Sequence, residues 1–218
     1  MKKEKLTYYI VRNVFSKELA AFVNEYFLLK RKVARKFFDT RYISPFTNEW
    51  GVWNDDQVPE TYAHYADIAM EVLLDRLRPL MEKKTGLKLY PTYSYARIYK
   101  KGDILARHKD RYSCEFSTTM NLGGDEWPIY LEEDPKHGFK KKKEPYVHGN
   151  TSGKKIILKP GDMLIYSGCE MEHWREEFTG ENCGQVFLHY NNAVGIDAEK
   201  NKYDSRISLG LPSDMKNK

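Results

Sequence analysis

Three side chains of types that commonly bind metal ions lie in two short segments of the chain, as His108, Asp110 and His173. Residues i and i+2 of a β-strand face the same side, so His108 and Asp110 can bind one ion while Lys109 points away. His173 lies on another expected strand and can supply the third ligand. Two imidazoles and one carboxylate leave octahedral positions open on a metal ion. Non-haem iron(II) oxygenases use such open positions to hold a cosubstrate and dioxygen together. The spacing therefore predicts an iron(II) site rather than a structural zinc site.

Residues 1–86 are expected to form a helical support for this site. Ser16 is a favourable N-cap residue, and apolar residues recur at helical spacing after it, which predicts a helix over 16–38. Pro59 is expected to open a second helix that runs to about Lys84 and ends at Gly86. Of the other histidines, His64 is expected inside this helix as a packing or surface residue. The two tryptophans of the connecting loop, Trp50 and Trp53, either pack on the core or form a substrate lid.

Residues 87–194 change to short β-rich segments broken by turn residues. We expect strands near residues 90–99, 104–109, 115–122, 128–132, 155–158, 163–166, 172–175 and 185–191. Eight short strands after two helices predict one α+β domain with a jelly-roll barrel. Residues 134–153 form a polar insertion that contains the run Lys140–Lys143, His137 and His148, and neither histidine is expected to be a ligand. Residues 195–218 have little apolar periodicity and are expected to form a loose tail.

Composition fits a folded protein without a membrane segment. Of the 218 residues, 41% are hydrophobic and 31% are charged, values typical of a globular domain. The sequence contains no long uncharged apolar run, and its start lacks the apolar core of a signal peptide, so an intracellular, cytoplasmic protein is expected. The three cysteines are far apart, which indicates reduced thiols. The net charge of +5 and the Lys140–Lys143 run fit a solvated surface, or a guide for an acidic protein or nucleic acid.

Residues 93–191 resemble the iron(II) and 2-oxoglutarate-dependent dioxygenases, in particular their prolyl-hydroxylase-like branch. The segments that carry the resemblance are 97–99, 108–110, 158–166, 172–175 and 185–190, where 158–166 includes a Pro-Gly-Asp turn that leads towards His173. The resemblance implies a double-stranded β-helix in which 2-oxoglutarate is oxidatively decarboxylated to succinate while a C–H bond is hydroxylated. It also implies iron(II), 2-oxoglutarate and dioxygen as cofactor and cosubstrates, with ascorbate as a further candidate.

The sequence departs from this family where the far carboxylate of 2-oxoglutarate usually binds. Family members place an arginine or lysine nine to twelve residues past the distal histidine, whereas residues 182–185 include no cation. Arg175 is the first candidate for this role, because it lies two residues from His173 and should share its face. The alternative is a surface pair of Arg175 with Glu170 or Glu177. Arg111, which follows Asp110, is the second candidate.

Further polar residues are candidates for the wall of the site. Tyr99 stands nine residues before His108, where related enzymes often place an aromatic hydroxyl near the cosubstrate. Asn121 shares one face of the next expected strand with Ser117 and Thr119, and these side chains could donate hydrogen bonds. The alternative is that all four are ordinary strand residues. His189, on the last expected strand, is a candidate for the pocket lining but not for a fourth metal ligand.

The substrate is less constrained than the chemistry. The resemblance favours hydroxylation of a peptidyl residue in a peptide or protein, or of a free amino acid. Oxidation of a nucleic-acid base or of a small metabolite is the second reading, because one fold serves many substrates. A reading of another class is a cupin-like β-barrel that binds a ligand without catalysis. Iron content, and stabilisation of the fold by 2-oxoglutarate, distinguish this binding module from an enzyme.

Overall fold

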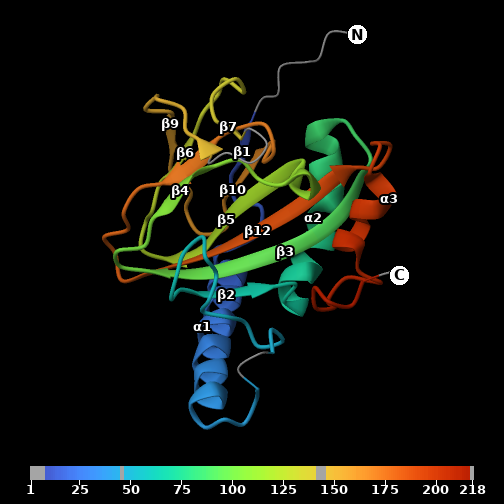
Figure 1. Ribbon diagram of the computed structural model, residues 1–218. Helices are drawn as coiled ribbons and strands as arrows, with labels where there is room; N and C mark the ends of the chain where they lie inside the picture. The colour runs from blue at the N-terminus through green and yellow to red at the C-terminus, as the bar shows by residue number, and fades with distance from the viewer. Residues whose placement is uncertain (1–7, 45–46, 141–145, 217–218) are drawn as a thin grey trace.

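Two antiparallel sheets form the centre of the protein in the computed structural model, which describes residues 8–44, 47–140 and 146–216 (Figure 1). The six-stranded sheet has the order β1-β10-β5-β12-β3-β2, and the four-stranded sheet has the order β4-β11-β6-β9. The bounds of the first sheet are β1 (Tyr9–Val11), β10 (Met163–Tyr166), β5 (Phe116–Gly124), β12 (Asn182–Asn192), β3 (Leu89–Lys100) and β2 (Tyr62–Tyr65). Those of the second are β4 (Leu105–His108), β11 (His173–Arg175), β6 (Ile129–Leu131) and β9 (Lys154–Ile156).

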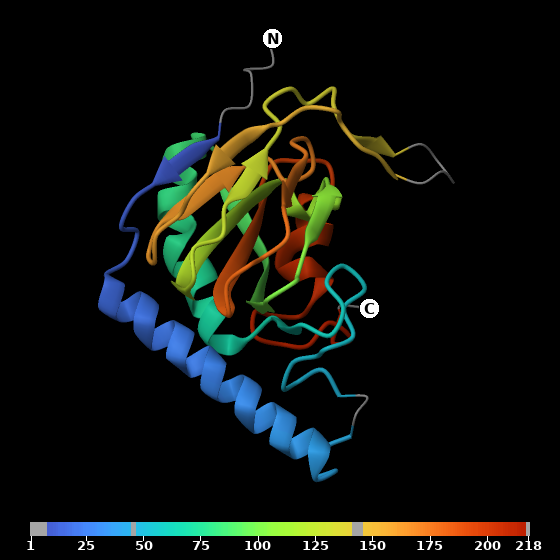
Figure 2. The same cartoon turned by 90° about the vertical axis from the view of Figure 1, so that its left-hand side faces the viewer.

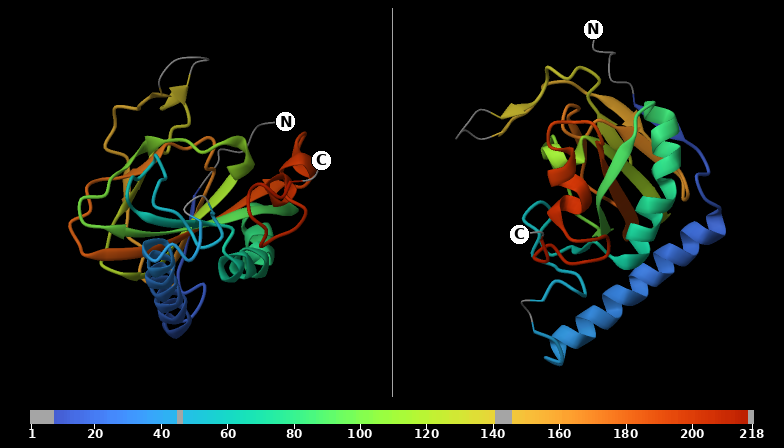
Figure 3. Two further views of the ribbon diagram at one scale, coloured as in Figure 1. Left: turned by 60° about the horizontal axis from the view of Figure 1, so that its bottom comes forward. Right: turned by 90° about the vertical axis from the view of Figure 1, so that its right-hand side faces the viewer.

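The six-stranded sheet separates an apolar layer from the interior between the sheets. Alternate residues of a strand face opposite sides, and in β3 Ala96 and Ile98 join the large apolar cluster formed with α1 and α2. Tyr95 and Tyr99 of the same strand line a cavity on the other side. Both helices lie on one side of the sheet, as Figures 1 and 2 show. The second sheet faces the opposite side (Figure 3), so the polar interior lies between the two sheets.

The first expected helix is confirmed as α1 (Lys17–Asp39). Ser16 is its N-cap, and the Ser16 hydroxyl accepts a hydrogen bond from the backbone N–H of Leu19 at 3.2 Å. Val23 and Phe27 are buried against the sheet. The two tryptophans of the following loop pack against this helix, in the ring contacts Phe37–Trp50 and Phe38–Trp53, which fits the core-packing interpretation.

The second expected helix is only partly correct, because residues 62–65 near its expected start form the strand β2. α2 extends over Ile68–Thr85 and ends, as predicted, at Gly86, whose φ of 70° is left-handed. Asp67 caps this helix by accepting hydrogen bonds from the backbone N–H groups of Ala69 and Met70. Residues 62–65 pair with β3 instead, and this non-local pairing outweighs the local helical spacing. His64 therefore lies on a strand, where it is buried.

All eight expected strands are present, with bounds that differ by up to three residues, and the sequence did not indicate β1 or β2. The polar insertion contains a further hairpin, β7 (Phe139–Lys140) and β8 (Tyr146–Val147), which projects from the body in Figure 2. Lys141 to Lys143 of the lysine run lie outside the described residues. Within the described ranges no strand of one sheet pairs with the other, so the expected barrel is present as two antiparallel sheets. None of the described helices is long and apolar enough to cross a membrane.

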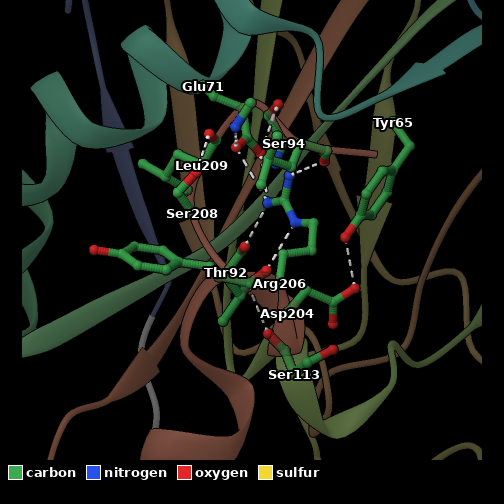
Figure 4. Close-up of polar contacts among 12 residues, drawn as sticks. Tyr65, Glu71, Thr92, Ser94, Ser113, Asp204, Arg206, Ser208 and Leu209 are labelled. Carbon is green, nitrogen blue, oxygen red and sulfur yellow. Dashed lines mark hydrogen bonds and ion pairs between the residues drawn. The ribbon is translucent and has the colours of Figure 1, made fainter. Parts of the chain in front are cut away.

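The C-terminal segment is docked rather than loose. It forms α3 (Ala198–Asn201) and the 3-10 turn η2 (Lys202–Ser205), after which the side chain of Arg206 is fully buried. The Arg206 guanidinium donates to both carboxylate oxygens of Glu71 on α2, at 3.0 and 3.1 Å, and to the backbone oxygen of Thr92 (Figure 4). Polar contacts hold this segment, which explains why apolar periodicity did not reveal it.

Candidate metal centre

Two neighbouring strands bring the two candidate histidines together. His108 ends β4, His173 begins β11, and the two residues are directly opposite each other in the antiparallel pair. Their ring centroids are 4.2 Å apart. Asp110 follows β4, and its backbone N–H donates to the carbonyl of Gly168 at 2.8 Å. The strand pairing thus joins residues from distant parts of the sequence, as the spacing analysis requires.

The ligand atoms of these three residues converge. Asp110 Oδ1 lies 3.6 Å from His108 Nε2 and 3.5 Å from His173 Nε2. One ligand atom from each residue lies within 4.8 Å of the other two, which is close enough for one metal ion. The three sequence-predicted ligands therefore form one cluster.

The surroundings of the cluster orient these atoms for a metal ion. His108 Nδ1 lies 2.7 Å from the carbonyl of Ala106, and His173 Nδ1 lies 3.0 Å from the carbonyl of Met171. A carbonyl only accepts, so both Nδ1 atoms carry the proton and both Nε2 atoms keep a lone pair. Histidine ligands of metals are commonly fixed in this way by a backbone carbonyl. The donor set fits the iron(II) ion that the sequence predicts.

Asp110 is held as a carboxylate by its neighbours. The hydroxyl of Ser117 donates to Asp110 Oδ2 at 2.7 Å, which leaves Oδ1 directed to the histidines. Burial opposes ionisation, but the neighbouring imidazoles of His173 and His108 hold the pKa of Asp110 well below its usual value. The ligand is thus anionic at neutral pH.

A second group of possible ligands shares Asp110 and adds Cys114 and His189. Burial raises the pKa of the Cys114 thiol, which is therefore protonated at neutral pH and a poor metal ligand. Burial also lowers the pKa of His189 to about 4, so this imidazole is neutral. His189 Nδ1 lies 3.0 Å from the Ser117 hydroxyl, and the His189 ring lines the cavity beside the metal cluster. The cluster with His108 and His173 is the better metal site.

A cavity of about 330 Å³ opens onto the cluster between the two sheets. Its wall includes the sequence-predicted Tyr99 and residues of both sheets. Tyr99 is fully buried, and its hydroxyl accepts a hydrogen bond from Arg97 at 3.3 Å. The other lining residues are Asp55, Gln57, Tyr93, Tyr95, Leu105, His108, Lys109, Asp110, Arg111, Cys114, Ile129, Tyr166, His173, Phe187 and His189.

Arg175 is buried between the sheets, with 1% of its surface exposed. Its Nη2 donates to Thr119 Oγ1 and Gln185 Oε1 at 3.3 and 3.2 Å, its Nη1 donates to the carbonyl of Trp127, and its Nε has no partner. Among the described residues no carboxylate pairs with this guanidinium, so the alternative of a surface ion pair with Glu170 or Glu177 is wrong.

The environment of Arg175 favours an added anion. Burial lowers the pKa of Arg175, because the charged form loses its hydration and gains no acidic partner. The guanidinium lies over the ring of Trp127, and Trp127 also contacts the ring of Tyr99. A buried arginine with polar but neutral neighbours is suited to a ligand carboxylate, which arginine binds through two parallel hydrogen bonds.

The other two candidates for cosubstrate binding have other partners. Arg111 lines the cavity, but its guanidinium pairs with both oxygens of Asp204 at 2.8 and 2.9 Å. The amide of Asn121 donates to the carbonyl of Leu158 at 2.7 Å and so holds the 158–162 turn, away from the cavity lining. Sequence spacing predicts the face of a strand on which a residue lies but not a contact with a distant segment. For this reason the observed partners of Arg111 and Asn121 differ from the predicted cosubstrate.

Sequence reasoning did not identify a polar cluster that β3 forms with the 54–58 loop. Arg97 is buried, and its guanidinium binds Asp55 Oδ2 at 2.5 Å and Gln57 Oε1 at 3.2 Å. Gln57 Nε2 in turn lies 3.1 Å from His108 Nε2. An arginine between inward-facing Tyr95 and Tyr99 was a usable signal, whereas the 54–58 loop has no pattern that indicates a site. Arg97 differs from Arg175 in that Asp55 already balances its charge.

A second cavity of about 530 Å³ adjoins the metal cavity, and Asp55 and Tyr95 line both. Its wall comes from the loop around residues 48–55, from β2 and from the C-terminal segment. The remaining lining residues are Lys30, Asn48, Glu49, Gly51, Val52, Asn54, His64, Tyr65, Ala66, Ile68, Gly210, Pro212 and Ser213. The three candidate metal ligands line only the smaller of the two cavities.

No protein-family model matches the chain. A curated relative, a tRNA(Ile)-lysidine synthase from Persephonella marina, is 28% identical over 151 residues, which are 62% of this chain and 31% of that protein. The chain thus spans about a third of the length of the curated relative that it matches. This match does not assign a family.

Solved structures share the fold at low identity. HygX from Streptomyces hygroscopicus, with nickel and 2-oxoglutarate bound, gives a TM-score of 0.58 at 13% identity over 88% of this chain and 85% of that one. The non-heme alpha ketoglutarate dependent epimerase SnoN gives 0.55 at 15% identity over 87% and 79%. A Pseudomonas putida prolyl-4-hydroxylase gives 0.50 at 13% identity over 85% and 92%. The chain therefore has the fold of the 2-oxoglutarate and iron(II) oxygenases, as its resemblance to them predicts.

Proposed function

We propose that this protein is an iron(II) and 2-oxoglutarate-dependent oxygenase that hydroxylates a C–H bond. The observation that carries the proposal is the convergence of His108 Nε2, His173 Nε2 and Asp110 Oδ1 beside a cavity. The fold shared with HygX, whose structure holds 2-oxoglutarate, supports the choice of cosubstrate. When bound, iron(II) supplies the redox chemistry by which dioxygen, 2-oxoglutarate and a C–H substrate become succinate, carbon dioxide and an alcohol.

Each residue of the site has a distinct task. His108, Asp110 and His173 would hold the iron, and Ser117 keeps the Asp110 carboxylate in place. Arg175 would bind the far carboxylate of 2-oxoglutarate, because it is a buried cation without an acidic partner among the described residues. Tyr99, which lines the metal cavity from β3, would contribute a hydroxyl to that end of the cosubstrate. The role of these residues is to bind, orient and exclude water.

The substrate would occupy the adjoining cavity of about 530 Å³, next to Asp55 and Tyr95. A peptidyl residue or an amino acid is the first substrate class, which the likeness to a prolyl-4-hydroxylase supports. In this arrangement the metal cavity holds the cosubstrate and the adjoining cavity holds the molecule to be oxidised.

Metal and cosubstrate binding provide the first test of the function. A ligand that binds only the folded state raises its unfolding midpoint. We expect Mn(II) with 2-oxoglutarate to raise the midpoint of the wild-type protein, and iron(II) with 2-oxoglutarate to yield succinate. Asp110→Ala and His173→Ala should lose both effects.

The exposed histidine His148, which lies in the polar insertion, offers a matched control. His148→Ala should behave as the wild-type protein in both assays. Wild-type protein that neither binds the metal nor responds to 2-oxoglutarate would favour the non-catalytic binding module. Full succinate production by Asp110→Ala and His173→Ala would exclude the proposed ligands.

A further inference from the structure

A carboxylate from the C-terminal segment reaches the loop that carries the metal ligand Asp110. Asp204, in η2, accepts hydrogen bonds from Arg111 Nη1 at 2.8 Å and from Arg111 Nη2 at 2.9 Å. Asp204 is 5% exposed, and its Oδ2 also accepts a hydrogen bond from the hydroxyl of Tyr65 at 2.7 Å (Figure 4). Arg111 is the residue directly after Asp110, so this pair joins the end of the chain to the candidate metal centre.

The backbone that presents this carboxylate has an unusual conformation. Tyr203, Asp204 and Ser205 have φ values of 54°, 58° and 63°, which are all left-handed and rare for residues with a Cβ. Such conformations persist only where the surrounding structure holds them, and they cluster at functional sites. Here Arg206 holds the segment by its bonds to Glu71. The segment thus adopts a strained turn that directs Asp204 to Arg111.

Asp110 is fixed from two sides by contacts already described, and Arg111 provides a third. The Ser117 hydroxyl holds the Asp110 carboxylate, and the carbonyl of Gly168 holds its backbone N–H. The Arg111 guanidinium lies 4.5 Å above the ring of Tyr93, which lines the metal cavity. The pair with Asp204 therefore fixes the direction in which the chain leaves the metal ligand.

We infer that Asp204 is a positioning residue for Asp110, acting through Arg111, so that the C-terminal segment preorganises the metal centre. The inference rests on the proposed metal site. Residues that orient metal ligands from outside the coordination shell commonly change metal affinity by about 10-fold to 100-fold. The same segment lines the adjoining cavity through Gly210 and Ser213, so one segment contacts both parts of the proposed active site.

A purely structural role explains this pair less well. The side chain of Arg111 is 52% exposed, and ion pairs with such exposed partners contribute little to stability. The pair between Arg206 and Glu71 already anchors the segment, with side chains that are 0% and 2% exposed. Loss of the Asp204 charge should therefore change the metal site more than it changes the fold.

The test compares metal affinity with stability in Asp204→Asn. Asparagine retains one acceptor for Arg111 but loses the charge and the two-point contact. We expect the Kd for Mn(II), measured by calorimetry on metal-free protein, to rise about 10-fold, while the unfolding midpoint of the metal-free protein stays nearly unchanged. Tyr65→Phe is the matched control, because it removes the other hydrogen bond to Asp204 and leaves the Arg111 pair. Its Kd should equal that of the wild-type protein.

A double-mutant cycle tests whether Asp204 acts through Arg111. Arg111→Met should raise the Kd to a similar extent, and Asp204→Asn should cause no further rise in that background. Additive effects, or a wild-type Kd in Asp204→Asn, would overturn the inference while leaving the metal site intact. A wild-type protein that does not bind Mn(II) would overturn both proposals. If Asp204→Asn fails to fold, a wild-type Kd in Arg111→Met still overturns the inference.

Discussion

Arg175 shows how one buried charge indicates a ligand. Moving a guanidinium from water to the interior costs free energy, which a protein normally offsets with a carboxylate. Arg97, on β3 of the other sheet, has this partner in Asp55, whereas Arg175 contacts a threonine, a glutamine and a backbone carbonyl. The two arginines therefore have different tasks. Arg97 binds Asp55 and Gln57 of the 54–58 loop, and we propose that Arg175 binds the cosubstrate.

We predict that Arg175→Met separates cosubstrate binding from stability. The metal ligands stay in place, so the variant should still bind Mn(II). 2-Oxoglutarate, added with Mn(II), should no longer raise its unfolding midpoint, because loss of a charged hydrogen-bonding partner costs about 3 kcal/mol, or roughly 100-fold in affinity. Without ligands, Arg175→Met should be at least as stable as the wild-type protein, because an uncompensated buried charge is removed.

Arg111→Met, which alters an arginine that already has an acidic partner, is the comparison variant for this experiment. It should retain a 2-oxoglutarate-dependent rise in the midpoint when Mn(II) is saturating. A normal rise in Arg175→Met would show that the far carboxylate binds elsewhere.

At the residue scale, the sequence predicts the metal site better than its surroundings. His108 and Asp110 are two residues apart on one strand end, so local spacing alone places them together. Arg175 and His173 share a face for the same reason. Asp204 could not be found in this way, because its contact with Arg111 joins positions 93 residues apart and depends on a strained turn. Local spacing identifies the face of a strand on which a residue lies, whereas the contacts of its side chain depend on the tertiary structure.

At the element scale, Asp67 connects the two long helices. Its Oδ1 caps α2, and its Oδ2 accepts hydrogen bonds from Tyr26 at 2.8 Å and Lys30 at 2.5 Å, both on α1. His64 Nδ1 of β2 lies 3.2 Å from the same oxygen. Although burial opposes ionisation, the contacts with His64, Lys30 and Tyr26 lower the pKa of Asp67. One carboxylate thus joins α1, β2 and α2.

This lowered pKa predicts how stability depends on pH. A carboxyl group whose pKa is lower in the folded state stabilises the protein fully above its unfolded pKa of about 3.9, and the contribution is lost as the pH falls towards the folded pKa. Asp67→Asn should therefore destabilise the protein by about 3 kcal/mol at pH 7, because Lys30 loses its buried partner.

At pH 3 the difference between the wild-type protein and Asp67→Asn should be smaller by about 1 kcal/mol. Urea unfolding followed by circular dichroism at both pH values measures it. Asp75→Asn, on the exposed surface of α2, is the control and should change stability by less than about 1 kcal/mol. A difference for Asp67→Asn that is equal at pH 3 and pH 7 would contradict the role of the charge.

Elements with local patterns were predicted better than those held by distant partners. Eight of the ten strands in the two sheets alternate apolar and polar residues or follow turn residues, and the sequence predicts their positions to within three residues. β2 was assigned to a helix, because Tyr62 and Ala66 fit a helical spacing that the pairing with β3 overrides. The sequence predicts a loose C-terminal segment, because polar contacts such as the buried pair of Arg206 with Glu71 hold it and leave no apolar periodicity.

At the scale of the whole molecule, the sheets, the 48–55 loop and the C-terminal segment border two adjoining cavities. The helices cover the outer face of the six-stranded sheet and leave its inner face for the site (Figure 2). The C-terminal segment and the 48–55 loop border the larger cavity, and Asp55 and Tyr95 mark where it adjoins the smaller one. This arrangement predicts that cosubstrate and substrate binding can be altered independently.

Ser213→Trp tests this independence by placing an indole at the wall of the larger cavity. The residue is half-buried and belongs to the C-terminal segment, and Arg175 does not line the larger cavity. We expect the variant to keep the stabilisation by Mn(II) and 2-oxoglutarate, because the metal cavity is unchanged. The rate of oxygen addition to members of a peptide and amino-acid library, measured by mass spectrometry, should fall at least about 10-fold, because the added indole excludes the substrate from its site.

Val194→Trp places the same side chain at a position that is 85% exposed and outside both cavities, and it should leave both measurements unchanged. Oxygen addition by Ser213→Trp at the wild-type rate would place the substrate outside the larger cavity. A loss of the response to 2-oxoglutarate in Ser213→Trp would instead show that the two cavities are one binding site, since the added side chain would then act on the cosubstrate itself.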